Sequence, residues 1–84
     1  MSKRYNRWLN FNFDYIPNGE FRVTQYLVND NINVDIFAND DPYDSAVFVK
    51  NGVPICVEIM ILDHKAWYTD LLLDTEFIDY LESL

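Results

Sequence analysis

The sequence predicts an α+β domain: an antiparallel sheet of about five strands with a helical C-terminal segment packed on one face. Apolar and polar side chains alternate through the first half of the chain, and short clusters of turn-forming residues separate the alternating segments. After His64, apolar residues recur at helical spacing instead. With 84 residues, half of them apolar, the chain is long enough for a single domain spanning residues 1–84.

The first three strands are expected over residues 8–15, 20–28 and 32–36. Each has apolar side chains on one face and polar side chains on the other, which is typical of a strand buried on one side. The links at residues 17–19 and 29–31 are rich in Pro, Asn, Asp and Gly, which favour turns. Links this short join neighbouring antiparallel strands, so the three strands are expected to form a meander.

Two further strands are expected over residues 46–50 and 53–62, after a polar, acidic loop at residues 38–45. The dipeptide Asn51-Gly52 between them is the strongest hairpin signal in the chain and suits a type I′ turn. The segment 53–62 is apolar on both faces except at one position, which indicates a central strand covered on both sides.

Glu58 is that one position. A buried carboxylate is costly unless it is paired. The sequence therefore favours a Glu58 side chain that faces solvent or pairs with a basic residue, for which Arg22, Lys50 and Lys65 are the candidates. The alternative is that Glu58 marks an interface with another protein.

The C-terminal segment, residues 64–84, fits two short helices better than one. The first would carry Trp67 and Leu71 on one face, four residues apart. The second would begin with Asp74 as its N-cap. Its predicted core face comprises Phe77, Ile78 and Leu81. The competing interpretation makes residues 66–73 a sixth strand, because side chains in this stretch also alternate.

Charge is distributed unevenly along the chain, which has 14 acidic and six basic residues. Residues 1–7 carry a charge of +3, whereas residues 23–84 carry twelve carboxylates against Lys50 and Lys65, a net charge of −10. A protein that grips a DNA or RNA backbone needs Lys and Arg for the phosphates, so direct nucleic-acid binding is not expected. The charge favours either an acidic surface that serves solubility or one that docks on a basic protein.

No metal or cofactor is expected. The loop residues Asn39, Asp40, Asp41 and Asp44 offer oxygen ligands that calcium would accept. Their spacing does not match an EF-hand loop, because there is no central Gly and no closing Glu. A solvated turn, in which Asp and Asn bond their own backbone, accounts for them.

No catalytic site is expected either. His64 is the sole histidine, and no nucleophile lies near it in a recognisable motif. Cys56 is the sole cysteine and lies in an apolar strand, where a thiol is usually inert. One His and one Cys are also too few for a zinc site.

The expected location is the cytoplasm. A lone cysteine allows no internal disulfide and fits a reducing compartment. The first residues lack the apolar region of a signal peptide, and the longest apolar stretch, residues 53–62, is too short to span a bilayer. No association with a membrane is expected.

The first functional hypothesis is a small acidic inhibitor that binds a basic, nucleic-acid-handling enzyme or complex and imitates the charge of a nucleic-acid backbone. The carboxylates expected to contact that partner are Asp40, Asp41, Asp44, Asp70, Glu76, Asp79 and Glu82. One alternative is an immunity or antitoxin-type protein that neutralises a toxin by the same attraction. Another is a structural subunit that forms a homodimer or larger homo-oligomer through exposed rings, with Tyr43 and Tyr68 as candidates.

In general character the chain is similar to phage-encoded inhibitors of host defence enzymes, which include anti-CRISPR and anti-restriction proteins. The resemblance lies in small size, acidity, aromatic and asparagine content and the lack of a catalytic motif, and in no particular residue. It implies a nucleic-acid-handling enzyme as the partner and, for a phage-encoded protein, the cytoplasm of the host cell as the location.

Overall fold

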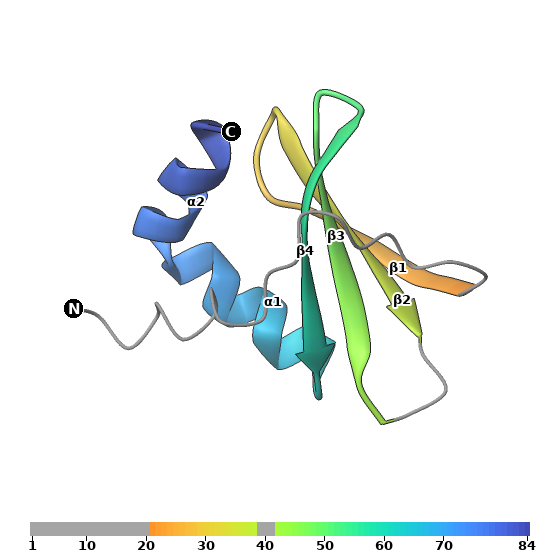
Figure 1. The fold of residues 1–84 in the computed structure, drawn as a ribbon. Coiled ribbons are helices and arrows are strands. Elements are labelled where there is room, and N and C mark those ends of the chain that lie inside the picture. Colours follow the sequence, from red (N-terminus) through yellow and green to blue (C-terminus); the bar gives the residue numbers. More distant parts are fainter. Residues whose placement is uncertain (1–20, 39–41) are drawn as a thin grey trace.

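The computed structural model describes residues 21–38 and 42–84 (Figure 1). The elements follow in the order β1 (Phe21–Leu27), β2 (Ile32–Ala38), β3 (Asp44–Lys50), β4 (Val53–Ile61), α1 (His64–Leu73) and α2 (Thr75–Glu82). A sheet followed by helices confirms the predicted α+β class. The strand predicted over residues 8–15 lies outside the described residues, so the count of about five strands stays a prediction.

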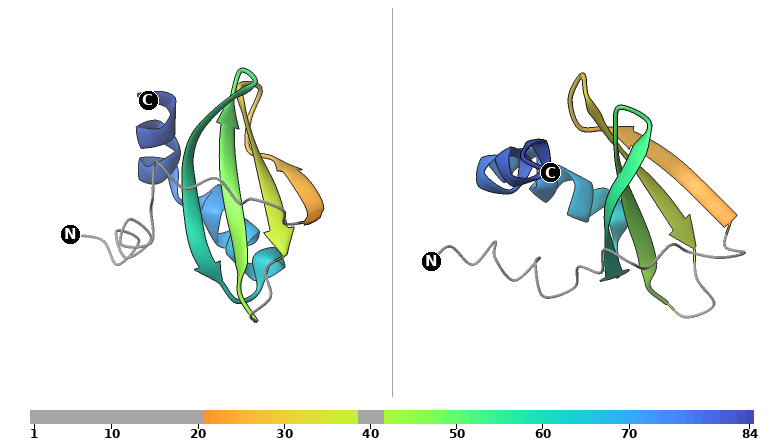
Figure 2. Two further views of the ribbon diagram at one scale, coloured as in Figure 1. Left: turned by 45° about the vertical axis from the view of Figure 1, so that its right-hand side comes forward. Right: turned by 45° about the horizontal axis from the view of Figure 1, so that its top comes forward.

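The described sheet is an antiparallel meander. Its strand order is β1-β2-β3-β4, so each strand pairs with its neighbour in the sequence. These four strands confirm those predicted over residues 20–28, 32–36, 46–50 and 53–62, with small shifts at their ends. Figure 2 shows both helices on the same side of the sheet, which leaves the other side of the strands facing away from them.

The turn between β3 and β4 is the hairpin predicted from Asn51-Gly52. Lys50 pairs with Val53, which leaves two residues in the loop. Asn51 and Gly52 have φ values of 51° and 83°. A positive φ at both central residues is what a type I′ turn requires. The local sequence therefore sets the pairing of β3 with β4 at this end of the sheet.

Within the described sheet, β4 stands at the end of the strand order and not at the centre as predicted. A β-bulge interrupts its alternation: Ser45 alone lies opposite Ile59 and Met60, and Met60 adopts a φ of 64°. The bulge places Glu58 and Ile61 on one face although they are three residues apart. Because the bulge interrupts the alternation of faces along β4, apolar residues occupy successive positions in its sequence, and the strand was therefore predicted to be apolar on both faces.

Buried side chains from the strands and the helices form one hydrophobic cluster. Phe48 of β3 contacts both helices, with ring-centre distances of 5.8 Å to Trp67 and 5.6 Å to Phe77. The buried members are Ile32, Val34, Ile36, Ala46, Phe48, Cys56, Ile61, Leu71, Phe77 and Leu81. From the predicted core face of the second helix, Phe77 and Leu81 are buried and Ile78 is half-buried.

Two aspartates define where the helices begin. Asp63 precedes α1 and accepts from the backbone N–H groups of Lys65 and Ala66, at 3.2 and 3.3 Å. Asp74 precedes α2 and accepts from the backbone N–H of Phe77 at 3.2 Å, which confirms its predicted capping role. The helical interpretation of residues 66–73 is confirmed as well. Neither helix of the described chain is long and apolar enough to cross a bilayer.

Candidate docking surface

Residues 63–84, which form the two helices and their ends, carry six carboxylates and one lysine, Lys65. Three of the six carboxylates hold the helices in place: Asp63 and Asp74 as N-caps, and Glu82 through a contact with the sheet. The other three, Asp70, Glu76 and Asp79, are exposed to solvent. The six carboxylates look alike in the sequence, but in the structure three have structural contacts and three are exposed to solvent.

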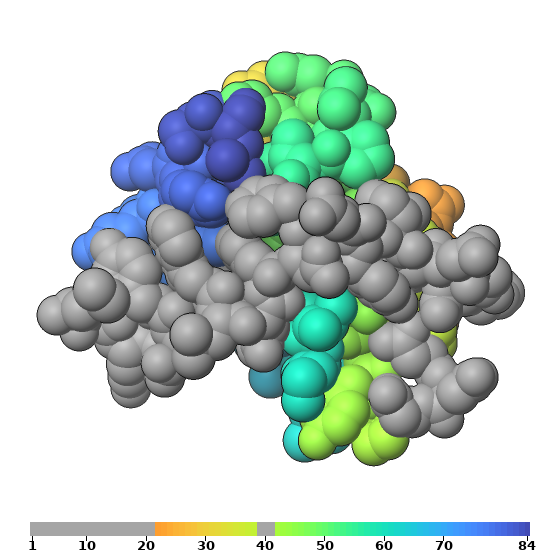
Figure 3. Space-filling model, viewed as in Figure 1, coloured from red at the N-terminus to blue at the C-terminus, as the bar shows by residue number. Residues whose placement is uncertain are grey.

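Glu82 fastens the end of α2 to the strands. Its Oε2 accepts from the side-chain amide of Asn31, in the link between β1 and β2, at 3.3 Å. Its backbone carbonyl accepts from Nζ of Lys50, which also reaches the carbonyl of Leu84 at 3.5 Å. A cation at this position also interacts favourably with the negative end of the helix dipole. Figure 3 shows the result, with α2 beside the β3–β4 hairpin at the top of the molecule.

Asp70, Glu76 and Asp79 form what we call the acidic helical surface. They lie on either side of the junction between α1 and α2, and all three side chains are exposed. Glu76 stands in the first turn of α2, where the helix dipole favours a negative charge. The three carboxylates outnumber Lys65, the one lysine on the same two helices, and an excess of negative charge attracts basic groups.

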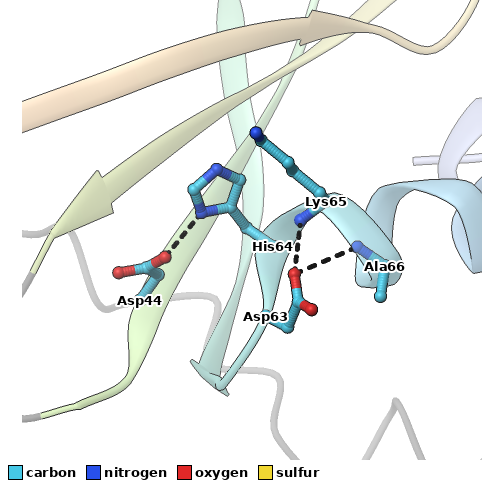
Figure 4. Close-up of polar contacts among 5 residues, drawn as sticks. All are labelled: Asp44, Asp63, His64, Lys65 and Ala66. Carbon is cyan, nitrogen blue, oxygen red and sulfur yellow. Dashed lines mark hydrogen bonds and ion pairs between the residues drawn. The ribbon is translucent and has the colours of Figure 1, made fainter.

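Asp44, which the sequence assigns to the partner surface, contacts the start of α1, and its role in binding a partner stays a prediction. Its Oδ2 lies 2.7 Å from Nδ1 of His64, and about a fifth of each side chain is exposed (Figure 4). The ring of Tyr26 lies 6.1 Å from that of His64. This contact joins β3 to α1. Asp40 and Asp41, the neighbouring candidates, lie outside the described residues.

The His64–Asp44 pair resembles half of a catalytic triad, in which a carboxylate orients an imidazole. A triad also needs a nucleophile. Burial, followed by the nearby charge of Glu58, raises the pKa of the Cys56 thiol from 9.0 to about 12, which keeps it protonated. The Ser83 hydroxyl donates to the backbone carbonyl of Tyr80. The side chain of His64 contacts Asp44 and Tyr26, so we describe the pair as a structural contact between β3 and α1.

The aromatic rings of the helices face inward. Tyr68 stacks on Tyr26 with 4.1 Å between ring centres, and its hydroxyl donates to the backbone carbonyl of Leu27 at 2.6 Å. The expectation that Tyr68 is an exposed ring is therefore wrong. Tyr43 is half-buried. The homo-oligomer built on exposed rings stays a prediction.

Glu58 is buried, with 5% of its surface exposed, so the expectation that it faces solvent is wrong. Its Oε2 accepts from the indole N–H of Trp67 at 2.8 Å. A second bulge in β4, where Ile55 is the extra residue between the Val49–Pro54 and Phe48–Cys56 pairs, places Glu58 opposite Ala46 and on the face of that buried residue. A bulge leaves no clear signal in the sequence, which is why the orientation of Glu58 was not predicted.

Across the described ranges, no group of three or more His, Cys, Asp or Glu side chains is arranged to hold a metal ion. Comparison of the chain with models of protein families, with curated proteins and with solved structures finds no match. The functional proposal therefore rests on the residues of this chain.

Proposed function

We propose that this chain is a small protein-binding inhibitor whose acidic helical surface docks on a basic, nucleic-acid-handling enzyme. The observation that carries the proposal is the exposure of Asp70, Glu76 and Asp79 on two helices that hold Lys65 as their one basic residue. Lysine and arginine side chains that bind phosphates are the natural complement of such a surface.

The attachment of the helices to the sheet supports this proposal. The Trp67–Glu58 and Tyr68–Leu27 hydrogen bonds connect α1 to β4 and β1, and the Lys50–Glu82 hydrogen bond connects α2 to β3. A surface that is ordered before binding loses less conformational entropy when the partner arrives. A fixed arrangement of charges also gives specificity and steers the encounter with the partner.

The proposed partner is an enzyme that binds nucleic acid. The Lys and Arg side chains with which it binds phosphates would also bind the carboxylates of this chain. We further propose that the inhibitor acts in the cytoplasm of a host cell, as a phage-encoded protein directed against a defence enzyme would. The single cysteine, which is buried, is compatible with a reducing compartment.

Competition provides the test. The partner is recovered from a host lysate with the immobilised chain, identified, purified and mixed with its own DNA or RNA ligand. We expect the chain to displace the nucleic acid, and the triple variant Asp70→Asn/Glu76→Gln/Asp79→Asn to displace it much less. The single variant Asp30→Asn, which removes an exposed charge from the link between β1 and β2, is the control and should displace it normally. A ternary complex of chain, partner and nucleic acid would contradict the proposal.

A further inference from the structure

Two adjacent leucines at the end of α1 are exposed. Leu72 and Leu73 expose 42% and 65% of their surfaces, whereas Leu71 is fully buried. Successive residues of an α-helix point about 100° apart, so three leucines in a row cannot all face one core. Leu71 occupies the core, and the next two side chains are directed toward solvent, where an apolar side chain of this size is poorly accommodated.

In the sequence, Leu72 and Leu73 lie between Asp70 and Glu76 of the acidic helical surface. Leu73 is three residues from Asp70 and three from Glu76, and Asp74 between them is buried. Figure 1 shows the junction of α1 and α2 at the left of the molecule. An apolar centre with charged residues around it is the usual composition of a protein–protein interface, in which a few central side chains supply most of the affinity.

We propose that Leu72 and Leu73 are the apolar anchor of the acidic helical surface, and that they bind an amphipathic helix rich in Lys or Arg on the partner. This inference rests on the proposed function and adds the kind of element that is recognised. An amphipathic helix supplies apolar side chains at spacings of three and four residues, together with basic residues at its margins. The leucines would contact the apolar side chains of that helix, and Asp70, Glu76 and Asp79 would contact its basic residues.

A second copy of this chain is a poorer occupant. Each copy would bring Asp70, Glu76 and Asp79 to the same interface, and the formal net charge of each copy is −8. Like charges brought together at an interface weaken association, whereas a basic segment is attracted. Charge complementarity therefore favours a basic partner over self-association.

The test uses a synthetic peptide of Lys and Leu arranged as an amphipathic helix, and a scrambled peptide of the same composition. Affinity for both is measured with the wild type, with Leu72→Ala/Leu73→Ala and with Leu62→Ala. Leu62, 70% exposed just before α1, is the matched control. Alanine preserves helix propensity, and circular dichroism with a thermal melt checks that each variant is folded.

We expect the double variant to bind the amphipathic peptide about tenfold more weakly, as truncation of central interface residues commonly does. The Leu62→Ala control should bind like the wild type, and the scrambled peptide should bind weakly to all three. Equal affinity of the wild type and the double variant for the amphipathic peptide would overturn the inference. So would a wild type that sediments as a dimer and becomes monomeric in the double variant, because the leucines would then bind a second copy.

The acidic variant Asp70→Asn/Glu76→Gln/Asp79→Asn separates this inference from the proposed function. If the acidic variant loses affinity while the leucine variant does not, the inference fails and the proposed function stands. If the acidic variant binds the peptide as the wild type does, the proposed function itself is contradicted.

Discussion

The carboxylate of Glu58 on β4 accepts a hydrogen bond from the indole N–H of Trp67 on α1, with 2.8 Å between the two atoms. The contact connects a buried charge of the sheet to the first helix. An ionised group taken out of water is costly unless donors satisfy it, and hydrogen bonds to charged groups are among the stronger ones in proteins. The contact therefore joins α1 to β4 through a buried polar pair.

Trp67→Phe tests this contact. The substitution removes the indole N–H that donates to the buried carboxylate of Glu58, and we expect the free energy of unfolding to fall by about 1–3 kcal/mol, with a further loss from the smaller ring. Urea denaturation followed by circular dichroism measures the change. Tyr68→Phe is the control: it removes the exposed bond to the carbonyl of Leu27 and should cost only about 0.5–1.5 kcal/mol. If the two variants lost equal free energy of unfolding, the contact with the buried Glu58 would contribute no more to stability than an exposed hydrogen bond.

Gly52→Val is expected to destabilise the β3–β4 hairpin. Gly52 has a φ of 83°, and an added Cβ would meet no atom within 4 Å, so the cost comes from the backbone conformation and not from a clash. The left-handed region costs a residue with a side chain about 1–2 kcal/mol, and more when the side chain is β-branched. A thermal melt measures the loss. Asn51→Gly, at a position with a φ of 51°, should be tolerated; a Gly52→Val variant that melts like the wild type would contradict the turn type.

The Cys56 thiol should resist alkylation in the native protein. Burial and the charge of Glu58 raise its pKa from 9.0 to about 12, so almost no thiolate is present at pH 8. Labelling with iodoacetamide, followed by mass spectrometry with and without urea, should show modification only of the unfolded chain. Rapid labelling of the native protein at pH 8 would contradict this assignment.

The same shift makes stability depend on pH in the alkaline range. The folded state holds the proton more tightly than the unfolded state, so the unfolded chain loses it first as the pH rises. The contribution of Cys56 is present in full below pH 9.0 and is lost as the pH rises toward about 12. Tyrosines and lysines titrate in the same window, so Cys56→Ala is the reference, and its stability should fall less steeply there than that of the wild type.

The contact between Asp44 and His64 should contribute to stability and not to partner binding. A partly exposed pair of this kind is typically worth about 0.2–1 kcal/mol. A double-mutant cycle with Asp44→Asn and His64→Ala, followed by urea denaturation, measures the coupling between the two side chains. Partner affinity should stay unchanged in His64→Ala. Loss of inhibition in a normally folded His64→Ala variant would show that the pair has a functional role.

Features fixed by a few neighbouring residues could be predicted from the sequence. Asn51-Gly52 determines its turn through the backbone conformations that these residues allow, and Asp74 caps a helix through an N–H three residues ahead. The alternating pattern of β2 reflects a strand with one buried face. These signals are local, so no tertiary information is needed to read them.

Contacts that depend on strand register could not be predicted. From a two-residue turn that pairs Lys50 with Val53, regular pairing would place Asp44 opposite Ile59; the bulges in β4 place it opposite Ile61. This shift brings Asp44 close to His64, three residues beyond Ile61. Because Asp44 was assigned by charge alone, its contact with His64 was missed. The charge pattern also does not distinguish a buried carboxylate from an exposed one: Asp74 is a buried cap, and Glu76, two residues later, is exposed.

The dependence of partner affinity on salt tests the central claim most directly. Affinity for the recovered basic enzyme is measured at low and high ionic strength for the wild type, for Asp70→Asn/Glu76→Gln/Asp79→Asn and for Asp30→Asn. We predict that the wild type and Asp30→Asn bind tightly at low salt and lose affinity as salt is added, because screening weakens attraction between exposed charges. The triple variant should bind weakly, with a shallower salt dependence. Tight binding by the triple variant, with no effect of salt on any of the three proteins, would contradict docking through the acidic helical surface.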